Sequence, residues 1–135
     1  MLALLADANV EGQLSRLVDL LESGPWRELW TALNVSVRTF EELGLPYDVT
    51  DAMLWQTCQQ HSLVLVTGNR NQRGPDSLES VIRNQNTLTS FPLLTLADPE
   101  RVMRDRRYAR HAAERLLDYL FEMDRYRGAG RLFLP

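Results

Sequence analysis

The stretch DVTDAMLWQTCQQHSLVLVTGNRN, residues 48–71, decides the fold that the sequence predicts. It starts with an acidic turn, continues as a short amphipathic helix from Asp51, and ends in an apolar run, residues 63–67. This run has no polar alternation, which is typical of a strand covered by helices on both faces of a parallel sheet. Such sheets carry their functional residues beyond the carboxyl ends of the strands. The sequence therefore predicts a candidate site at the end of this strand, in Thr67, Gly68, Asn69, Arg70 and Asn71.

The composition indicates one domain, residues 1–135, and excludes several kinds of chemistry. The chain has 135 residues and 44% hydrophobic content, enough for one core. All 15 basic residues are arginine, which excludes a phosphate-loop lysine, a Schiff-base lysine and the lysine of a receiver domain. The single cysteine, Cys58, excludes an internal disulfide or a cysteine zinc site, and its helical neighbours favour a buried apolar role.

The charges and the apolar runs bear on location. Residues 98–135 hold nine arginines and seven acids, whereas residues 1–97 hold six arginines and eleven acids, for a net charge of -3. The predicted site thus lies in the acidic part of the chain. No apolar run approaches membrane-spanning length and the first residues do not resemble a signal peptide, so we expect a cytoplasmic protein without a membrane partner.

Strands and helices alternate in the pattern before this stretch. Residues 2–6 predict a first buried strand that places Asp7 at its carboxyl end. Residues 13–21 have the i, i+3, i+4, i+7 spacing of a helix with one buried stripe. A second helix is expected from Pro25, which suits a first helical position, and a short strand at residues 35–37.

Two local patterns lie between residues 25 and 44. The second helix has apolar side chains on one face: Trp26, Leu29, Trp30 and Leu33. The two tryptophans could stack on a base, but this spacing favours a core or an interface. Thr39 and Glu42 fit a capping box, which predicts a helix of one to two turns ending at Gly44.

Asp51 has two interpretations. Thr50 can cap the helix that Asp51 begins, and a carboxylate there is stabilised by the helix dipole. Asp51 is then either a good helix start or a carboxylate directed at a metal beside the sheet. His61, near the end of the same helix, is expected to be a dipole partner or a partly buried histidine rather than a ligand.

The remaining segments predict a fourth strand and a mostly helical C-terminal part. Residues 76–79 have capping-box spacing, and Asp76 is either the cap, the favoured role, or a site acid displaced along the loop. A surface connection at residues 83–90 leads to a strand at residues 91–97. Residues 98–135 are predicted to be a helical extension that starts at Asp98-Pro99-Glu100 and breaks near residues 105–107.

One side of the extension is apolar: Ala109, Ala112, Ala113, Leu116, Leu117, Leu120 and Phe121. It also carries arginines that could hold phosphates or form a solvated, salt-bridged face, namely Arg101, Arg104, Arg106, Arg107 and Arg110. The apolar tail, residues 131–135, is expected to dock on the domain or on a second copy. A homodimer is therefore a further hypothesis.

Four or five strands alternating with helices indicate an α/β three-layer sandwich around a mainly parallel sheet. The motif Asp7-Ala8-Asn9-Val10 after the first strand, with Asp51 opening a helix before a strand that ends in Val-Thr, resembles the PIN-domain nucleases. The closest resemblance is to small bacterial PIN-like proteins with an Asp-x-Asn-Val motif. It covers residues 1–71 by motif and extends to about residue 97 by element order.

The resemblance implies cleavage of single-stranded RNA by carboxylates that bind Mg²⁺ or Mn²⁺. It implies that Asp7 and Asp51 are metal ligands. The catalytic residues would be Asp7, Asp51, Asn69 and Asp76. The residues that contact RNA would be Asn9, Arg70, Asn71 and Arg73. A toxin with an antitoxin-like protein partner is a role that the resemblance also implies.

The sequence departs from the family pattern in the loop after the third strand. Relatives usually carry an aspartate at the position of Asn69 and often another at that of Asn71. An amide coordinates through its oxygen but brings no charge, so the two substitutions weaken metal binding. Asp76 or Glu79 could fold back to replace the missing acids. Glu41 or Glu42 could supply another, although capping already explains Glu42.

The sequence is therefore compatible with three functions. The first is a metal-dependent ribonuclease, and the second is a catalytically weakened PIN-like protein that binds RNA or a protein through the same site and the arginine-rich helix. The third is a receiver-like signalling domain. The absence of lysine argues against the third, as does the position of Asp51 after Pro46-Tyr47-Asp48 rather than after a buried strand.

Overall fold

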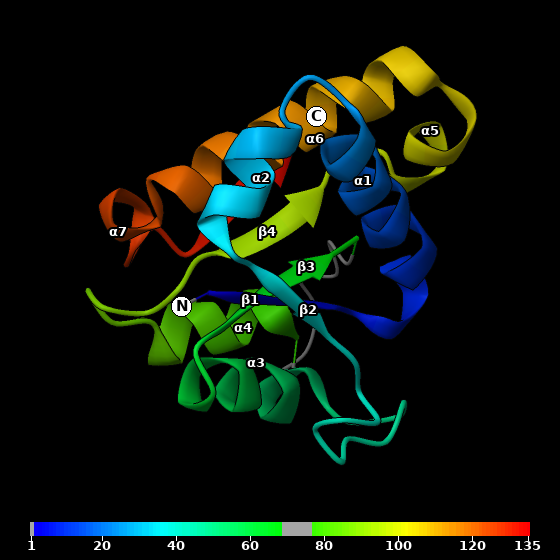
Figure 1. The fold of residues 1–135 in the computed structure, drawn as a ribbon. Coiled ribbons are helices and arrows are strands. Elements are labelled where there is room, and N and C mark those ends of the chain that lie inside the picture. Colours follow the sequence, from blue (N-terminus) through cyan, green and yellow to red (C-terminus); the bar gives the residue numbers. More distant parts are fainter. Residues whose placement is uncertain (1, 69–76) are drawn as a thin grey trace.

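The computed structural model describes residues 2–68 and 77–135, which form a parallel sheet between two layers of helices (Figure 1). The strands are β1 (Ala3–Ala6), β2 (Ser36–Arg38), β3 (Leu63–Thr67), β4 (Leu93–Leu96) and β5 (Arg131–Leu134). Their order in the sheet is β2-β1-β3-β4-β5, and every pairing is parallel. The predicted α/β three-layer sandwich is confirmed.

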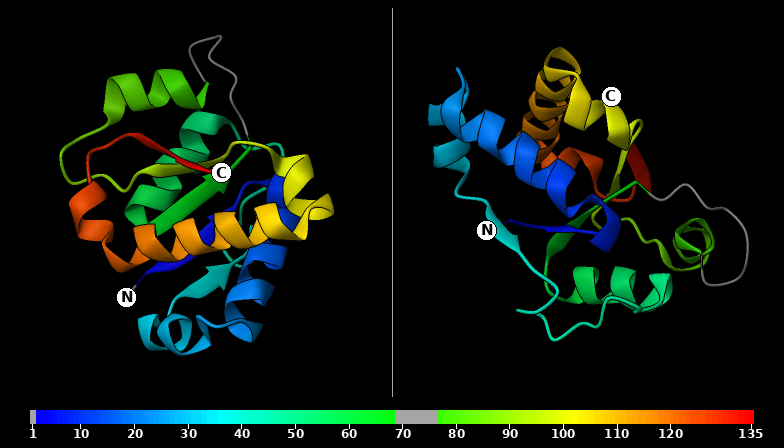
Figure 2. Two further views of the ribbon diagram at one scale, coloured as in Figure 1. Left: turned by 90° about the horizontal axis from the view of Figure 1, so that it is seen from above. Right: turned by 90° about the vertical axis from the view of Figure 1, so that its right-hand side faces the viewer.

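The helices divide between the two faces of the sheet. The helices on one side are α1 (Glu11–Ser23), α2 (Arg27–Leu33), α5 (Pro99–Arg104), α6 (Arg106–Phe121) and the short α7 (Met123–Tyr126). The other side carries α3 (Asp51–Gln60) and α4 (Leu78–Gln85). Figure 2 shows α6 crossing its face of the sheet beside α1. Within the described ranges, no helix combines the length and the apolar character needed to cross a membrane.

The central strands β3 and β4 are buried on both faces, as the unbroken apolar run of β3 predicts. All five residues of β3 are buried. Val64 and Val66 belong to the core that contains α1 and α6, whereas Leu63 and Leu65 belong to the core that contains α3 and α4. Successive side chains of a strand point to opposite faces, so each must be apolar when both faces are covered.

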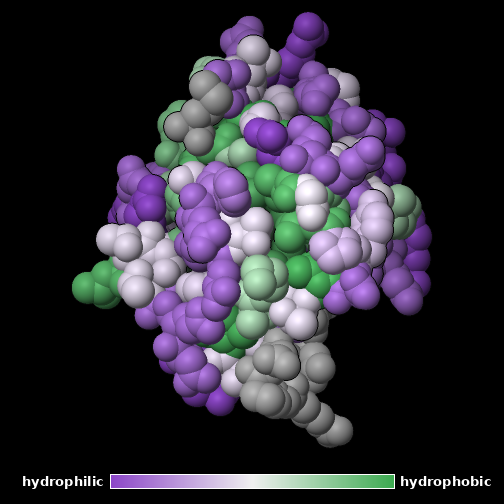
Figure 3. Space-filling model, turned by 90° about the horizontal axis from the view of Figure 1, so that it is seen from below, coloured by the Kyte–Doolittle hydropathy of each residue, from purple (hydrophilic) through white to green (hydrophobic). Residues whose placement is uncertain are grey.

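Seen from the side of α3, the surface shows apolar side chains between polar ones (Figure 3). Met53 in α3 is 52% exposed and Tyr47 is 66% exposed. The ring of Tyr47 stacks on the buried ring of Phe40 at a centroid distance of 5.2 Å. This stacking fixes the segment between β2 and α3 against the core that contains α3 and α4.

The helix predicted after Thr39 is wrong. The capping-box hydrogen bonds do form: the Glu42 backbone N–H donates to Thr39 Oγ1 at 3.2 Å, and the Thr39 N–H donates to Glu42 Oε1 at 3.0 Å. The backbone, however, closes only turns, and Gly44 has a φ of 68°, a left-handed conformation that ends any helix. A capping box stabilises a turn as well as a helix.

The apolar faces of α2 and α6 agree only in part with the prediction. Leu29 and Phe121 are 46% and 57% exposed, because the apolar stripes of α2 and α6 are wider than the surfaces that they cover. Trp30 is buried at 7% exposure, which confirms its core interpretation. The second helix begins at Arg27 and leaves Pro25 outside it.

The C-terminal segment docks on its own domain as a fifth strand. Asp105 caps α6 and separates it from α5, which confirms the predicted break. After α7 the chain returns to pair β5 with β4, and Leu134 is fully buried. The Arg131 guanidinium pairs with Glu79 of α4 at 3.2 Å and also donates to Thr95 Oγ1 of β4. The segment is therefore a helical extension only as far as α7.

We expect Leu134→Ala to lower the free energy of unfolding by about 2–5 kcal/mol, because it leaves a cavity beside β4. Leu88→Ala is the matched control, since the Leu88 side chain is 90% exposed, and it should change stability by less than about 0.5 kcal/mol. Urea unfolding followed by circular dichroism measures both. Equal effects of the two substitutions would show that β5 adds little to the core.

Candidate functional site

The order in which strands are added to the sheet reverses between β1 and β3. From β1 the chain adds β2 on one side, and from β3 it adds β4 and β5 on the other. In open parallel sheets, ligands bind in the crevice outside the carboxyl ends of the strands at such a reversal. Asp7 follows β1 and Thr67 ends β3, so the site predicted from the sequence falls at this position.

Asp7 is held in place by hydrogen bonds to both of its carboxylate oxygens. Oδ1 accepts from the Ala8 backbone N–H at 2.8 Å, and this bond caps the 3-10 helix η1 (Ala8–Val10). Oδ2 accepts from Thr67 Oγ1 at 3.0 Å, and the Asp7 N–H donates to the Val66 carbonyl at 2.8 Å. Each carboxylate oxygen keeps a second lone pair, so this half-buried group can still bind a cation.

Gly68 brings three elements together beside Asp7. A Cβ at this position would lie 2.9 Å from Pro99 Cγ, at the start of α5, and 3.0 Å from Val10 Cγ1, in η1. No larger residue fits here without moving one of these neighbours. This close approach could not be predicted from the sequence, because it joins the segments that follow β1, β3 and β4, which are distant from one another in the chain.

Asp51 starts α3 at the same edge of the sheet. Thr50 Oγ1 accepts from the Met53 N–H at 3.2 Å, which confirms the predicted cap. Because α3 ends just before β3 begins, its first residue lies at the end of the layer toward which the strands run (Figure 1). Asp51 is half-buried, and His61 is exposed at the other end of the helix, so its interpretation as a partly buried histidine is wrong.

Part of the predicted site lies outside the described residues: Asn69, Arg70, Asn71, Arg73 and Asp76. The cap of α4 is Ser77, whose Oγ accepts from the Ser80 N–H at 3.2 Å. The cap role favoured for Asp76 therefore belongs to the next residue. Asn9 lies in η1 and is exposed.

Two acids proposed as replacements have other partners. Glu42 pairs with Arg38 at 3.1 Å and caps the turn at Thr39. Glu79 pairs with Arg131. Across residues 2–68 and 77–135, no group of three or more His, Cys, Asp and Glu side chains could hold a metal ion.

Cys58 does not contribute a nucleophile. It is buried, as predicted, and burial raises the pKa of its thiol to about 12, with a smaller contribution from the negative charge of Asp7. The thiol is therefore protonated at neutral pH, and the reactive thiolate is absent.

Exposed arginines begin next to the site, where α5 follows β4. Arg101 pairs with Asp105 at 3.2 Å, and the pKa of Asp105 is lowered from 3.8 by hydrogen bonds from the Tyr108 N–H and from Arg101. A hollow of about 370 Å³ lies beside this pair and is lined by Arg107, His111 and Pro135 as well. In the described part of the chain, five exposed arginines of these two helices have no ion pair: Arg104, Arg106, Arg107, Arg110 and Arg115.

Comparison of the chain with models of known protein families, with curated proteins and with solved structures finds no match. The strand order β2-β1-β3-β4-β5 is shared by doubly wound folds of the flavodoxin type, which have many functions. A function must therefore be argued from the residues at the sheet edge.

We expect Gly68→Ala to lower the free energy of unfolding by about 1–3 kcal/mol, because the added methyl group overlaps Pro99 and Val10. Gly12→Ala is the matched control. Gly12 lies within α1 with nothing within 4 Å of its added Cβ, so this change should stabilise the protein by up to about 1 kcal/mol. Thermal unfolding of the two variants tests the opposite signs.

Proposed function

We propose that this chain is a PIN-like, divalent-metal-dependent ribonuclease that cleaves single-stranded RNA at the carboxyl ends of β1 and β3. The observation that carries the proposal is the fixed carboxylate of Asp7, held by Thr67 across the point where the sheet reverses. Asp51 adds a second acid at the same edge, as the Asp-x-Asn-Val resemblance implies.

The two acids fit a hard divalent cation. Mg²⁺ is usually held by one or two carboxylates together with water and substrate phosphates. Asp7 and Asp51 are the residues that would hold it, and Asp51 lies in the first turn of α3, where the helix dipole favours a negative charge. When bound, such an ion activates water and stabilises the departing oxygen of a phosphodiester.

The other residues of the site orient the Asp7 carboxylate or bind RNA. Thr67 donates to Asp7 Oδ2 and so sets the orientation of the carboxylate. Asn9, exposed two residues later, offers an amide to the RNA backbone. The exposed arginines of α5 and α6 offer bidentate contacts to the phosphates of an RNA strand that runs from the site along these two helices.

The deciding experiment is Mn²⁺ titration by calorimetry with the wild type, Asp7→Asn and Asp51→Asn, followed by RNA cleavage on the same samples. We expect micromolar binding that each substitution weakens at least about tenfold, because each removes a charged ligand. Cleavage should require the metal and be lost in both variants. Asp118→Asn, an exposed acid on α6, is the control and should behave as the wild type. A folded wild type that binds no Mn²⁺ would overturn the metal mechanism.

A second candidate is a catalytically weakened RNA-binding module with the same surface. It is favoured by the lack of a three-ligand cluster among the described residues and by the exposed arginines beside the site. In this case the protein binds RNA with or without metal and does not cleave it.

RNA binding itself can be tested through its dependence on salt. We expect the combined change Arg104→Gln, Arg107→Gln and Arg110→Gln to weaken binding of single-stranded RNA and to reduce the slope of log K against log salt. The slope should fall by about 0.7 for each RNA phosphate that an arginine no longer neutralises. Arg125→Gln is the control, because Arg125 is paired with Glu122 at 2.6 Å. An unchanged slope in the triple variant would exclude this face from RNA binding.

A further inference from the structure

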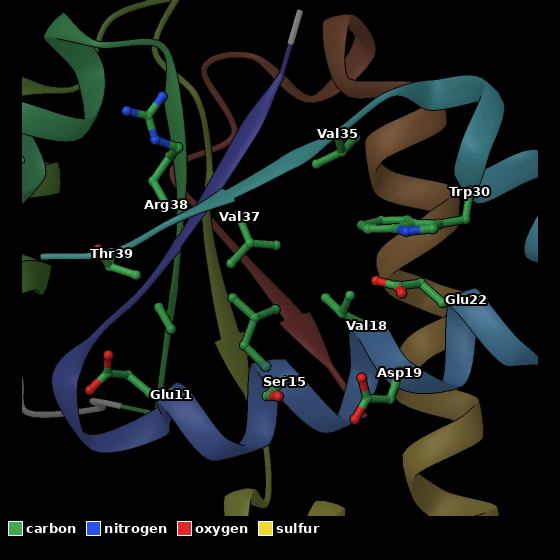
Figure 4. Close-up of a pocket in the computed structure, with 12 residues that line it drawn as sticks. Glu11, Ser15, Val18, Asp19, Glu22, Trp30, Val35, Val37, Arg38 and Thr39 are labelled. Atoms are coloured by element: carbon green, nitrogen blue, oxygen red, sulfur yellow. The ribbon is translucent and has the colours of Figure 1, made fainter. Parts of the chain in front are cut away.

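A groove of about 480 Å³ runs between α1 and β2, on the side of the sheet opposite α3 (Figure 4). Its floor is apolar and is formed by Ala6, Leu14, Val18, Val35 and Val37. Trp30 of α2 closes one end, where a second hollow of about 360 Å³ continues the groove toward Asn34.

The groove lies over the edge of the sheet. In the described residues β2 pairs only with β1, and all three residues of β2 are exposed. Val37, whose side chain faces the groove, is 43% exposed (Figure 4). The layer of helices that covers β1, β3 and β4 therefore leaves this part of β2 open.

The wall formed by α1 is acidic. Glu11, Asp19 and Glu22 line the groove, and none of them has an ion pair among the described residues. Arg38 lies at the end of the groove opposite Trp30, but it is paired with Glu42 at 3.1 Å. Arg27 lies in the adjoining hollow, beyond Trp30.

The spacing of these acids indicates a long ligand. Glu11 and Glu22 are eleven residues apart on one helix, which corresponds to about 16 Å, or three turns. One small cation cannot contact both ends of such a wall. A second helix lying beside α1 presents side chains with the same period and can meet all three acids.

We propose that this groove binds an amphipathic, cationic helix from a partner protein. The apolar stripe of the helix covers Val18, Val35 and Val37, and its arginine or lysine side chains face Glu11, Asp19 and Glu22. A cation beside Glu22 also reaches the indole of Trp30, which lines the same groove (Figure 4). The docked helix completes the helical layer over β2.

The test uses a synthetic amphipathic peptide of about four helical turns, with leucines on one face and arginines flanking them. A second peptide carries glutamate in place of each arginine. Calorimetry measures binding to the wild type and to two triple variants. The groove variant is Glu11→Gln, Asp19→Asn and Glu22→Gln. The control variant makes the same charge change on α5 and α6, with Glu100→Gln, Glu114→Gln and Asp118→Asn.

We expect the arginine peptide to bind the wild type and the control variant alike, and the groove variant about tenfold more weakly or worse. The glutamate peptide should not bind. No binding of the arginine peptide, or an equal weakening in both triple variants, would overturn the proposal. So would a mass in light scattering that rises with protein concentration and returns to the monomer only in the groove variant, because a second copy then fills the groove.

The proposal that the groove binds a helix is independent of the nuclease proposal. Asp7→Asn should bind the arginine peptide as the wild type does, because Asp7 does not line the groove. Loss of metal binding in that variant therefore leaves the groove proposal intact, and loss of peptide binding in the groove variant leaves the nuclease proposal intact.

Discussion

The structure depends on the burial of a parallel sheet on both faces. The four apolar side chains of β3, residues 63–66, each lie in one of two cores, so the strand has no room for a polar group until its last residue. The first hydroxyl of the run, on Thr67, is fully buried and donates to Asp7. This hydrogen bond therefore lies where the apolar core ends and the candidate site begins. It satisfies a buried polar group and, at the same time, fixes the acid on which the proposed chemistry depends.

Elements with local signals could be predicted from the sequence. The bounds of β3, the Thr50 cap of α3 and the break at Asp105 follow from apolar runs and from caps, whose contacts lie within a few residues. The prediction of a helix after Thr39 was wrong because a capping box has the same contacts in a turn. Periodicity also placed Phe121 in the core, because it gives the direction of a side chain but not the width of the surface that the helix meets.

The candidate site could be predicted only in part. The rule that parallel strands end at one edge predicted Asp7 at the end of β1, and the start of α3 at Asp51 followed from the Thr50 cap. The order of the strands, the Thr67 bond and the contact of Gly68 with Pro99 depend on segments distant in the sequence, and no local pattern encodes them. The pairing of Glu79 with Arg131 is of the same kind, and it removes one acid that the sequence offered as a replacement ligand.

The position of β5 in the sheet has a consequence for folding. Leu94 pairs with Leu132, 38 residues later, and Leu4 pairs with Val64, 60 residues later. Sheets with such distant partners fold slowly, since long loops must close before the pairing can stabilise them. Without β5, β4 would be an edge strand whose four residues are all apolar or threonine. An open edge of this kind pairs readily with other chains, so β5 also protects the sheet from aggregation.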